Sequence, residues 1–153
     1  MLRKPAPTGP TTQMLSTRKT VLVASYDMDL ALRLKQQFSA KNLRTTICSS
    51  FSEMLRLITE SDIAVLVLDF SMESMKDGLP EVDNMHALRE ARKLPKGDRL
   101  PVITATTVES TQMVGCLIQG YTAFLKRDHL EQQMGKYLDQ FLEKGKLDLN
   151  RPL

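Results

Sequence analysis

Hydrophobic residues follow two alternating patterns along the chain between residues 20 and 142. Short apolar runs rich in β-branched side chains predict strands, and apolar residues three or four positions apart predict amphipathic helices. The expected strands span residues 20–24, 44–48, 63–68, 101–105 and 122–125. The expected helices cover residues 29–41, 85–93 and 110–119 and the segments around 54–58 and 130–141. A strand followed by a helix, repeated five times, specifies an α/β fold with a doubly wound five-stranded parallel sheet and helices on both faces.

The third expected strand, residues 63–68, is apolar without alternation. Such a strand is covered on both faces, which a parallel sheet flanked by helices provides. Asp69 ends this strand, and a longer irregular segment, residues 70–84, follows it. The second strand, residues 44–48, is more polar, as is typical of a sheet edge. We therefore expect the third strand inside the sheet and the second at its edge.

Three helix boundaries carry local signals in the sequence. Ser50 and Glu53 have the spacing of a capping box, in which each side chain accepts a hydrogen bond from an N-terminal backbone N–H. Gly120 follows the fourth expected helix in the position of a C-terminal cap. Asp128 precedes the last apolar stripe and is expected to cap that helix.

The two ends of the chain differ in composition from its centre. Residues 1–18 are rich in Pro and Thr and have no hydrophobic period, so we expect a disordered leader. Residues 145–153 are polar and are expected to form a flexible tail. The remaining residues, 19–144, are expected to fold as one domain, which suits a chain of 153 residues.

Composition excludes several classes of partner and location. The formal net charge is +3, from 21 basic and 18 acidic residues, and the excess is spread along the chain, so we expect no direct binding to nucleic acid or membrane. No apolar run is long enough to cross a bilayer. Cys48 and Cys116 are too far apart for a disulfide framework or a zinc ribbon, and the N-terminus lacks the apolar stretch of a secretory signal. We therefore expect a reducing, cytoplasmic environment.

Chemically capable side chains follow four of the expected strands. In chain order they are Ser25, Tyr26 and Asp27, then Asp69, then Thr106 and Thr107, and finally Lys126 and Arg127. Parallel strands place their carboxyl ends on one rim of the sheet, so these side chains are expected to converge. A carboxylate beside a hydroxyl and a cation can accept a phosphoryl group. An Asp after a buried strand is also a common helix cap or turn former, so these residues alone do not name the reaction.

Over residues 20–142 the sequence resembles the receiver domain of two-component response regulators. The resemblance rests on VLVA at 21–24, VLVLD at 65–69, DFSM at 69–72 with DG at 77–78, PVI at 101–103 with Thr106, Gly120 followed by Phe124 and Leu125, and Asp128 before the last helix. It implies a flavodoxin-like sheet with strand order 2-1-3-4-5 and Asp69 as the phosphoacceptor at the end of the central strand. It also implies Thr106 and Phe124 as switch residues and Lys126 or Arg127 as the phosphate contact.

The sequence departs from the receiver pattern at the metal site. Receivers carry two adjacent acidic residues after the first strand to hold Mg²⁺, and here Ser25 and Tyr26 stand in those positions. Asp27 lies one residue after these two positions, so the remaining candidate metal ligands are Asp27 and Asp69. Because the carboxylate ligands are few, we expect weak Mg²⁺ binding of millimolar order or poorer. Arg127 aligns with the lysine after the fifth strand, and a forked guanidinium is not a neutral replacement for an ammonium.

The loop after Asp69 also departs from the family. Glu73 replaces a proline, and residues 76–84 lengthen the loop. Glu73 or Asp77 could supply a metal ligand, but loop carboxylates are usually solvated. These departures indicate an atypical receiver.

The sequence is compatible with three functions. The first is a signalling module that binds a sensor kinase or downstream target through the face formed by the fourth helix, fifth strand and fifth helix, at residues 113–117, Phe124 and 130–137. The second is a protein-interaction module that does not depend on phosphorylation. The third is an enzyme or nucleotide-binding protein, but no glycine-rich phosphate-binding loop follows any strand, so we expect no enzyme. The sequence leaves open whether the chain forms a homodimer.

Overall fold

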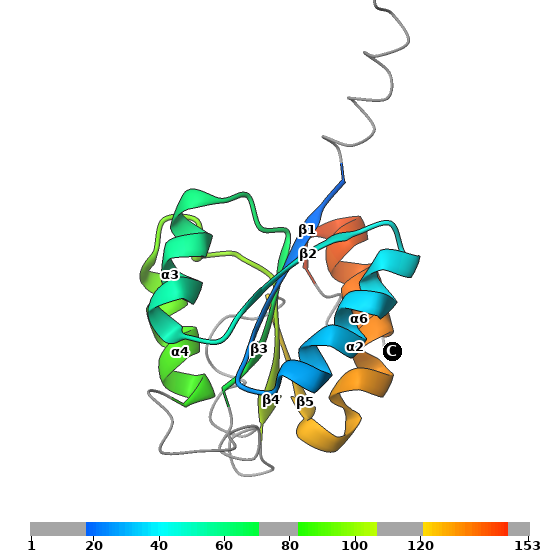
Figure 1. The fold of residues 1–153 in the computed structure, drawn as a ribbon. Helices are drawn as coiled ribbons and strands as arrows, with labels where there is room; N and C mark the ends of the chain where they lie inside the picture. The colour runs from blue at the N-terminus through cyan, green and yellow to red at the C-terminus, as the bar shows by residue number, and fades with distance from the viewer. Residues whose placement is uncertain (1–17, 71–82, 107–120, 147–153) are drawn as a thin grey trace, which may run out of the picture.

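The computed structural model of the chain describes residues 18–70, 83–106 and 121–146, without the side chain of Thr106. These residues contain a five-stranded sheet in the order β2-β1-β3-β4-β5 (Figure 1). The strands are β1 (Thr20–Ser25), β2 (Arg44–Cys48), β3 (Val65–Asp69), β4 (Val102–Thr106) and β5 (Thr122–Lys126). Every neighbouring pair is parallel. The predicted doubly wound sheet and its strand order are confirmed, and β3 lies at its centre.

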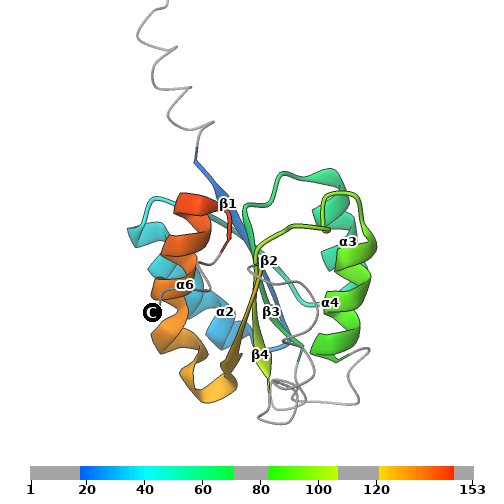
Figure 2. The ribbon, with the colours of Figure 1, turned by 180° about the vertical axis from the view of Figure 1, so that it is seen from behind.

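Helices cover both faces of the sheet (Figures 1 and 2). On one face lie α2 (Met28–Ala40) and α6 (Leu130–Lys144), and on the other lie α3 (Phe51–Glu60) and α4 (Asn84–Lys93). A short 3₁₀ turn, η2 (Arg127–His129), joins β5 to α6. The helix predicted at residues 110–119 and its cap Gly120 lie outside the described residues.

The sheet separates two hydrophobic clusters, and alternate strand residues contribute to each. In β1, Val21 and Val23 join the cluster under α2 and α6, whereas Leu22 and Ala24 join the cluster under α3 and α4. All five residues of β3 are buried, as predicted for a strand covered on both faces. Burying a side chain of this size stabilises the fold by about 1.5–3 kcal/mol. The central strand is therefore fixed in place on both sides, which holds its last residue, Asp69, at one rim of the sheet.

Among the described helices, α2, α3 and α4 begin with a side-chain cap and α6 does not. The Glu53 backbone N–H donates to Ser50 Oγ at 3.2 Å, so Ser50 caps α3 as predicted. The chain enters α2 one residue earlier than expected, because Asp27 Oδ1 accepts a hydrogen bond from the Leu30 N–H at 3.1 Å. The prediction that Asp128 caps the last helix was wrong. Asp128 falls inside the 3₁₀ turn, and α6 begins with no side-chain cap.

Arg92 of α4 links the helix to the amino-terminal end of β5. Its Nη1 donates to the backbone oxygens of Gly97, at 2.9 Å, and Leu100. Its Nη2 donates to the Tyr121 backbone oxygen at 3.0 Å and to Thr122 Oγ1 at 2.7 Å. Burial lowers the pKa of Arg92 to about 10, which leaves the guanidinium protonated at neutral pH. One half-buried cation therefore donates to four acceptors at the rim opposite Asp69.

Gly97 is required where the loop after α4 passes close to the helix. A Cβ at this position would lie 1.8 Å from the Ala91 backbone oxygen. We expect Gly97→Ala to lower the free energy of unfolding by about 1–2 kcal/mol, because the loop must shift away from the helix. Gly135→Ala is the matched control, since its Cβ would meet nothing nearer than 4.0 Å. In urea titrations, Gly135→Ala should be neutral or stabilising by up to about 1 kcal/mol, and equal effects of the two variants would contradict the close approach.

Cys48 at the end of β2 is buried, with 2% of its surface exposed. Burial is the main cause that raises the pKa of its thiol to about 12, and the nearby Glu53 carboxylate adds to the effect. The reactive thiolate is therefore nearly absent at neutral pH. We expect iodoacetamide to leave Cys48 unmodified in the folded protein at about pH 8 and to modify it fully in denaturant. Peptide mass spectrometry measures the extent of Cys48 alkylation, and rapid modification of the native protein would contradict the prediction.

Candidate functional site

Asp69 lies at the carboxyl-terminal rim of the sheet, where β3 ends. It is in register with Ser25, the last residue of β1. The Asp69 side chain is 1% exposed. Arg127, the residue after β5, donates from Nε to Asp69 Oδ2 at 3.2 Å. Residues from three strands thus meet at this rim, as the parallel topology requires.

The same guanidinium contacts a second carboxylate. Arg127 Nη2 donates to Asp27 Oδ2 at 3.0 Å. The two residues are 100 positions apart in the chain, and β1 and β5 are not neighbours in the sheet. Arg127 therefore reaches across the rim and bridges Asp69 and Asp27, a pairing that the sequence did not indicate.

Local structure fixes the Asp27 carboxylate. Its Oδ1 caps α2, and its own backbone N–H donates to Ser25 Oγ at 3.0 Å. Burial is the largest influence on the Asp27 pKa and raises it. The Leu30 N–H, the Arg127 guanidinium and the charge of Arg33 together outweigh burial and hold the pKa of Asp27 below its usual value. Asp27 is therefore a carboxylate at neutral pH, with both oxygens engaged.

Asn84, the first residue of α4, joins the ends of two strands at this rim. Its Oδ1 accepts a hydrogen bond from the Phe70 N–H, and its Nδ2 donates to the Ala105 backbone oxygen at 3.1 Å. The Phe70 ring is buried and stacks on Tyr26, with ring centroids 4.6 Å apart. Sequence reasoning missed Asn84, because an Asn at a helix start signals only a cap. The amide thus fixes the backbone directly after Asp69.

The remaining predicted site residues fall at different places. Phe124 is partly buried and packs against the cluster under α3 and α4. Lys126 is exposed at the end of β5, in register with Thr106 at the end of β4. Thr107 and the loop carboxylates Glu73 and Asp77 lie outside the described residues, as does segment 113–117. The structure therefore brings together Asp27, Asp69 and Arg127 and leaves Lys126 at the surface.

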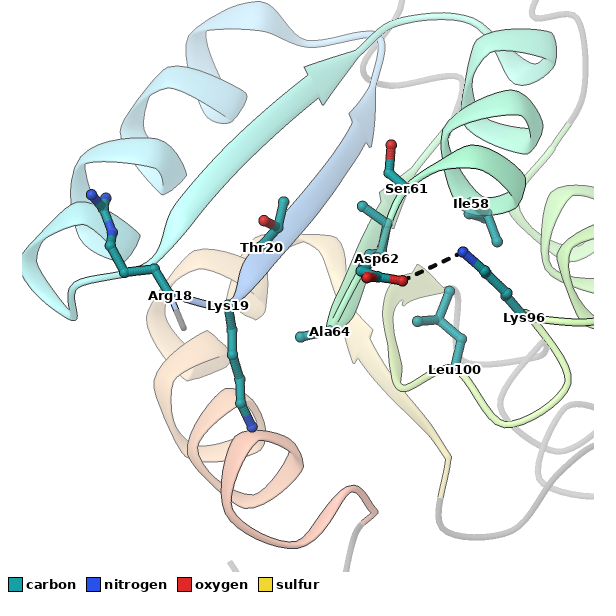
Figure 3. A pocket seen from close by; sticks show the side chains of 10 residues that line it. Arg18, Lys19, Thr20, Ile58, Ser61, Asp62, Ala64, Lys96 and Leu100 are labelled. Carbon is teal, nitrogen blue, oxygen red and sulfur yellow. Dashed lines mark hydrogen bonds and ion pairs between the residues drawn. The ribbon is translucent and has the colours of Figure 1, made fainter. Parts of the chain in front are cut away.

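A cavity of about 500 Å³ lies at the opposite, amino-terminal rim (Figure 3). Its lining includes Arg18, Ile63, Ala64 and Leu100. The ion pair between Lys96 Nζ and Asp62 Oδ1, at 3.4 Å, also lines it. None of the predicted site residues lines this cavity. The charged rim and the cavity are therefore separate features of the described structure.

The fold and the charged rim define a doubly wound α/β protein with a carboxylate site beyond the carboxyl ends of its strands. Solved structures with a similar fold include chemotaxis protein CheY4 of Vibrio cholerae, at 13% identity and a TM-score of 0.66 over 81% of this chain and 98% of that one. The receiver domain of the Francisella response regulator 1452 matches at 22% identity and a TM-score of 0.63, over 82% of this chain and 98% of that one. The receiver domain of a histidine kinase from Syntrophus aciditrophicus matches at 16% identity and a TM-score of 0.67, over 88% of this chain and 98% of that one.

This chain has the fold of response-regulator receiver domains, as the sequence resemblance implied. No protein-family model matches the sequence, and no curated protein is significantly similar to it. Across the described residues, no helix is long and apolar enough to cross a membrane.

The described rim does not fit the divalent cation that the receiver fold implies. Ser25 Oγ accepts the Asp27 N–H, and both oxygens of Asp27 are engaged by the α2 cap and by Arg127. The described residues contain no group of three or more His, Cys, Asp or Glu side chains arranged to hold a metal ion. A hard cation prefers several oxygen ligands, and this rim offers two carboxylates that already share a guanidinium. Weak Mg²⁺ binding by Asp27 and Asp69 stays a prediction.

Proposed function

We propose that the chain is a receiver module of two-component signal transduction with a degenerate phosphorylation site. It acts in the cytoplasm by binding a protein partner, and Asp69 accepts a phosphoryl group slowly. The observation that carries this proposal is the position of Asp69, buried at the carboxyl end of the central strand with Arg127 Nε at 3.2 Å. A buried carboxylate beside a fixed cation is an arrangement suited to phosphoryl transfer.

The proposed step is attack by an Asp69 carboxylate oxygen on the phosphorus of a phosphoryl donor. A bond forms between this oxygen and phosphorus, and the bond from phosphorus to the donor oxygen breaks. The product is an aspartyl phosphate. Arg127 supplies positive charge toward the incoming phosphoryl oxygens. The same ion pair withdraws electron density from the attacking carboxylate, and two adjacent acidic residues of the receiver pattern are absent. We therefore expect the reaction to be slow.

Partner binding is proposed for the surface around β5 and α6, which includes the predicted switch residue Phe124. Phe124 lies two residues before Lys126 on the strand that leads to Arg127. A phosphoryl group on Asp69 would add negative charge beside Arg127, and a shift of Arg127 would be transmitted to β5. The affinity of the sensor kinase or downstream target for this surface would then change.

Incubation with acetyl phosphate and Mg²⁺, followed by intact-mass measurement over time, tests this proposal. We expect slow incorporation of one phosphoryl group into the wild type and none into Asp69→Asn. Asp62→Asn is the matched control, because its fully exposed carboxylate precedes the same strand at the opposite rim. It should label like the wild type. Labelling that is retained in Asp69→Asn would contradict the assignment of the phosphoacceptor, and labelling completed at once would contradict a degenerate site.

A second candidate is a protein-interaction module that does not depend on phosphorylation. The Arg127 bridge favours it, because both carboxylates already have a counter-charge without a metal ion. In that case the wild type would remain unlabelled, and Asp69→Asn would bind the partner as the wild type does. The labelling experiment therefore separates the two candidates.

A further inference from the structure

One guanidinium holds the two carboxylates of the carboxyl-terminal rim together. Arg127 Nε donates to Asp69 Oδ2 at 3.2 Å, and Arg127 Nη2 donates to Asp27 Oδ2 at 3.0 Å. A guanidinium is planar and carries N–H groups on different edges, so it can serve two acceptors at once. The three side chains come from the carboxyl ends of three different strands or directly after them, and only the folded sheet assembles them.

The carboxylates need a cation in this position. The Asp69 side chain is 1% exposed, and a buried carboxylate without a counter-charge is strongly unfavourable. Asp27 cannot turn away freely, because its other oxygen caps α2 through the Leu30 N–H. The Arg127 side chain is itself only 28% exposed, so solvent screens the two ion pairs less than at an open surface.

We propose that Arg127 is the built-in counter-cation of Asp27 and Asp69 and that it competes with divalent metal ions for them. This inference rests on the proposed function, because it concerns the regulation of the same site. Asp27 and Asp69 are the two carboxylates that would hold a hard divalent cation at this rim, and they are the same two that Arg127 contacts. Binding of the guanidinium and binding of a metal ion to this pair therefore exclude each other.

Removal of Arg127 should create a metal site instead of destroying one. In Arg127→Met the side chain keeps its apolar stem and loses its charge, so the guanidinium no longer neutralises the two carboxylates. We expect the Mg²⁺ affinity of this variant, measured by calorimetry, to exceed that of the wild type by about tenfold or more, because no ion pair has to be displaced. Its melting temperature should rise at Mg²⁺ concentrations too low to change that of the wild type.

Lys126→Met is the matched control. It removes one positive charge from the neighbouring residue, whose side chain is exposed at the end of β5. A general electrostatic effect would raise the Mg²⁺ affinity of both variants equally, whereas our inference predicts a change only in Arg127→Met. Adding Asp69→Asn to Arg127→Met should abolish the gained affinity.

Arg127→Lys keeps the inference testable if Arg127→Met does not fold. Lysine keeps the charge but places one compact ammonium on a flexible stem where arginine has a rigid fork. It should hold the two carboxylates less firmly, so this variant should bind Mg²⁺ more tightly than the wild type. Equal Mg²⁺ affinity in the wild type and the Arg127 variants, or an equal gain in Lys126→Met, would overturn the inference. These readouts are metal affinity and melting temperature, so they stand apart from the labelling experiment. A failure of phosphorylation would leave them unchanged.

Discussion

Arg92→Ala is expected to lower the free energy of unfolding by about 3–4 kcal/mol. The variant removes the Arg92 donor from four acceptors in the loop after α4 and at the start of β5. The Gly97 and Tyr121 oxygens keep a second, backbone donor. The largest loss therefore falls on the Leu100 oxygen and Thr122 Oγ1. Buried acceptors without a partner lose the hydrogen bonds that water would provide in the unfolded chain. Urea titration of the purified variant, followed by circular dichroism, measures this effect.

Arg89→Ala is the control for this prediction. Arg89 lies one turn earlier on α4, with an exposed side chain, and the substitution makes the same change of residue type and charge. We expect its effect to stay within about 0.5 kcal/mol, as for most surface substitutions. If Arg92→Ala were as mild as Arg89→Ala, the hydrogen bonds of Arg92 would contribute no net stability.

Asn84→Ala is expected to lower the free energy of unfolding by about 2–3 kcal/mol. It removes the acceptor of the Phe70 N–H and the donor to the Ala105 carbonyl, both at the rim that holds Asp69. The effect should also be local, because the Phe70 amide depends on this side chain for its protection from solvent. Hydrogen exchange should therefore accelerate at Phe70 by more than the loss of global stability accounts for.

Gln36→Ala provides the comparison for Asn84→Ala, because it removes an exposed amide from α2. Its effect on stability should be within about 0.5 kcal/mol, and exchange at Phe70 should match the wild type. Unchanged exchange at Phe70 in Asn84→Ala would show that Asn84 does not fix the backbone after Asp69.

Most of the architecture could be predicted because it depends on short-range patterns. The apolar run before Asp69 specified a strand covered on both faces, and the structure buries every residue of β3. Ser50 was identified as a cap from the residue three positions later. The parallel topology then required the residues after β1, β3 and β5 to share one rim. Asp69 could therefore be placed at the centre of that rim from the sequence and its resemblance to receivers.

Local signals were less decisive where two structures compete for the same residues. Asp128 has the residue type and position of a helix cap, but the chain forms a 3₁₀ turn there. Asp27 was interpreted as a weak metal ligand one residue late, and the structure uses it as the cap of α2. The capping preference of Asp is the same in both places, and the path of the backbone after each strand determined the outcome.

Long-range side-chain pairs were determined by the tertiary structure alone. Arg127 meets Asp27 across 100 residues, and Arg92 meets Thr122 across 30. The sequence placed Arg127 at the same rim as Asp69, but it indicated neither the bridge to Asp27 nor any partner for Arg92. Periodicity records which face of an element is buried, but it contains no information on which polar side chains meet where elements pack together. The sequence and its resemblance thus determined the sheet and its central carboxylate, and the packing of the rim determined which cation neutralises that carboxylate.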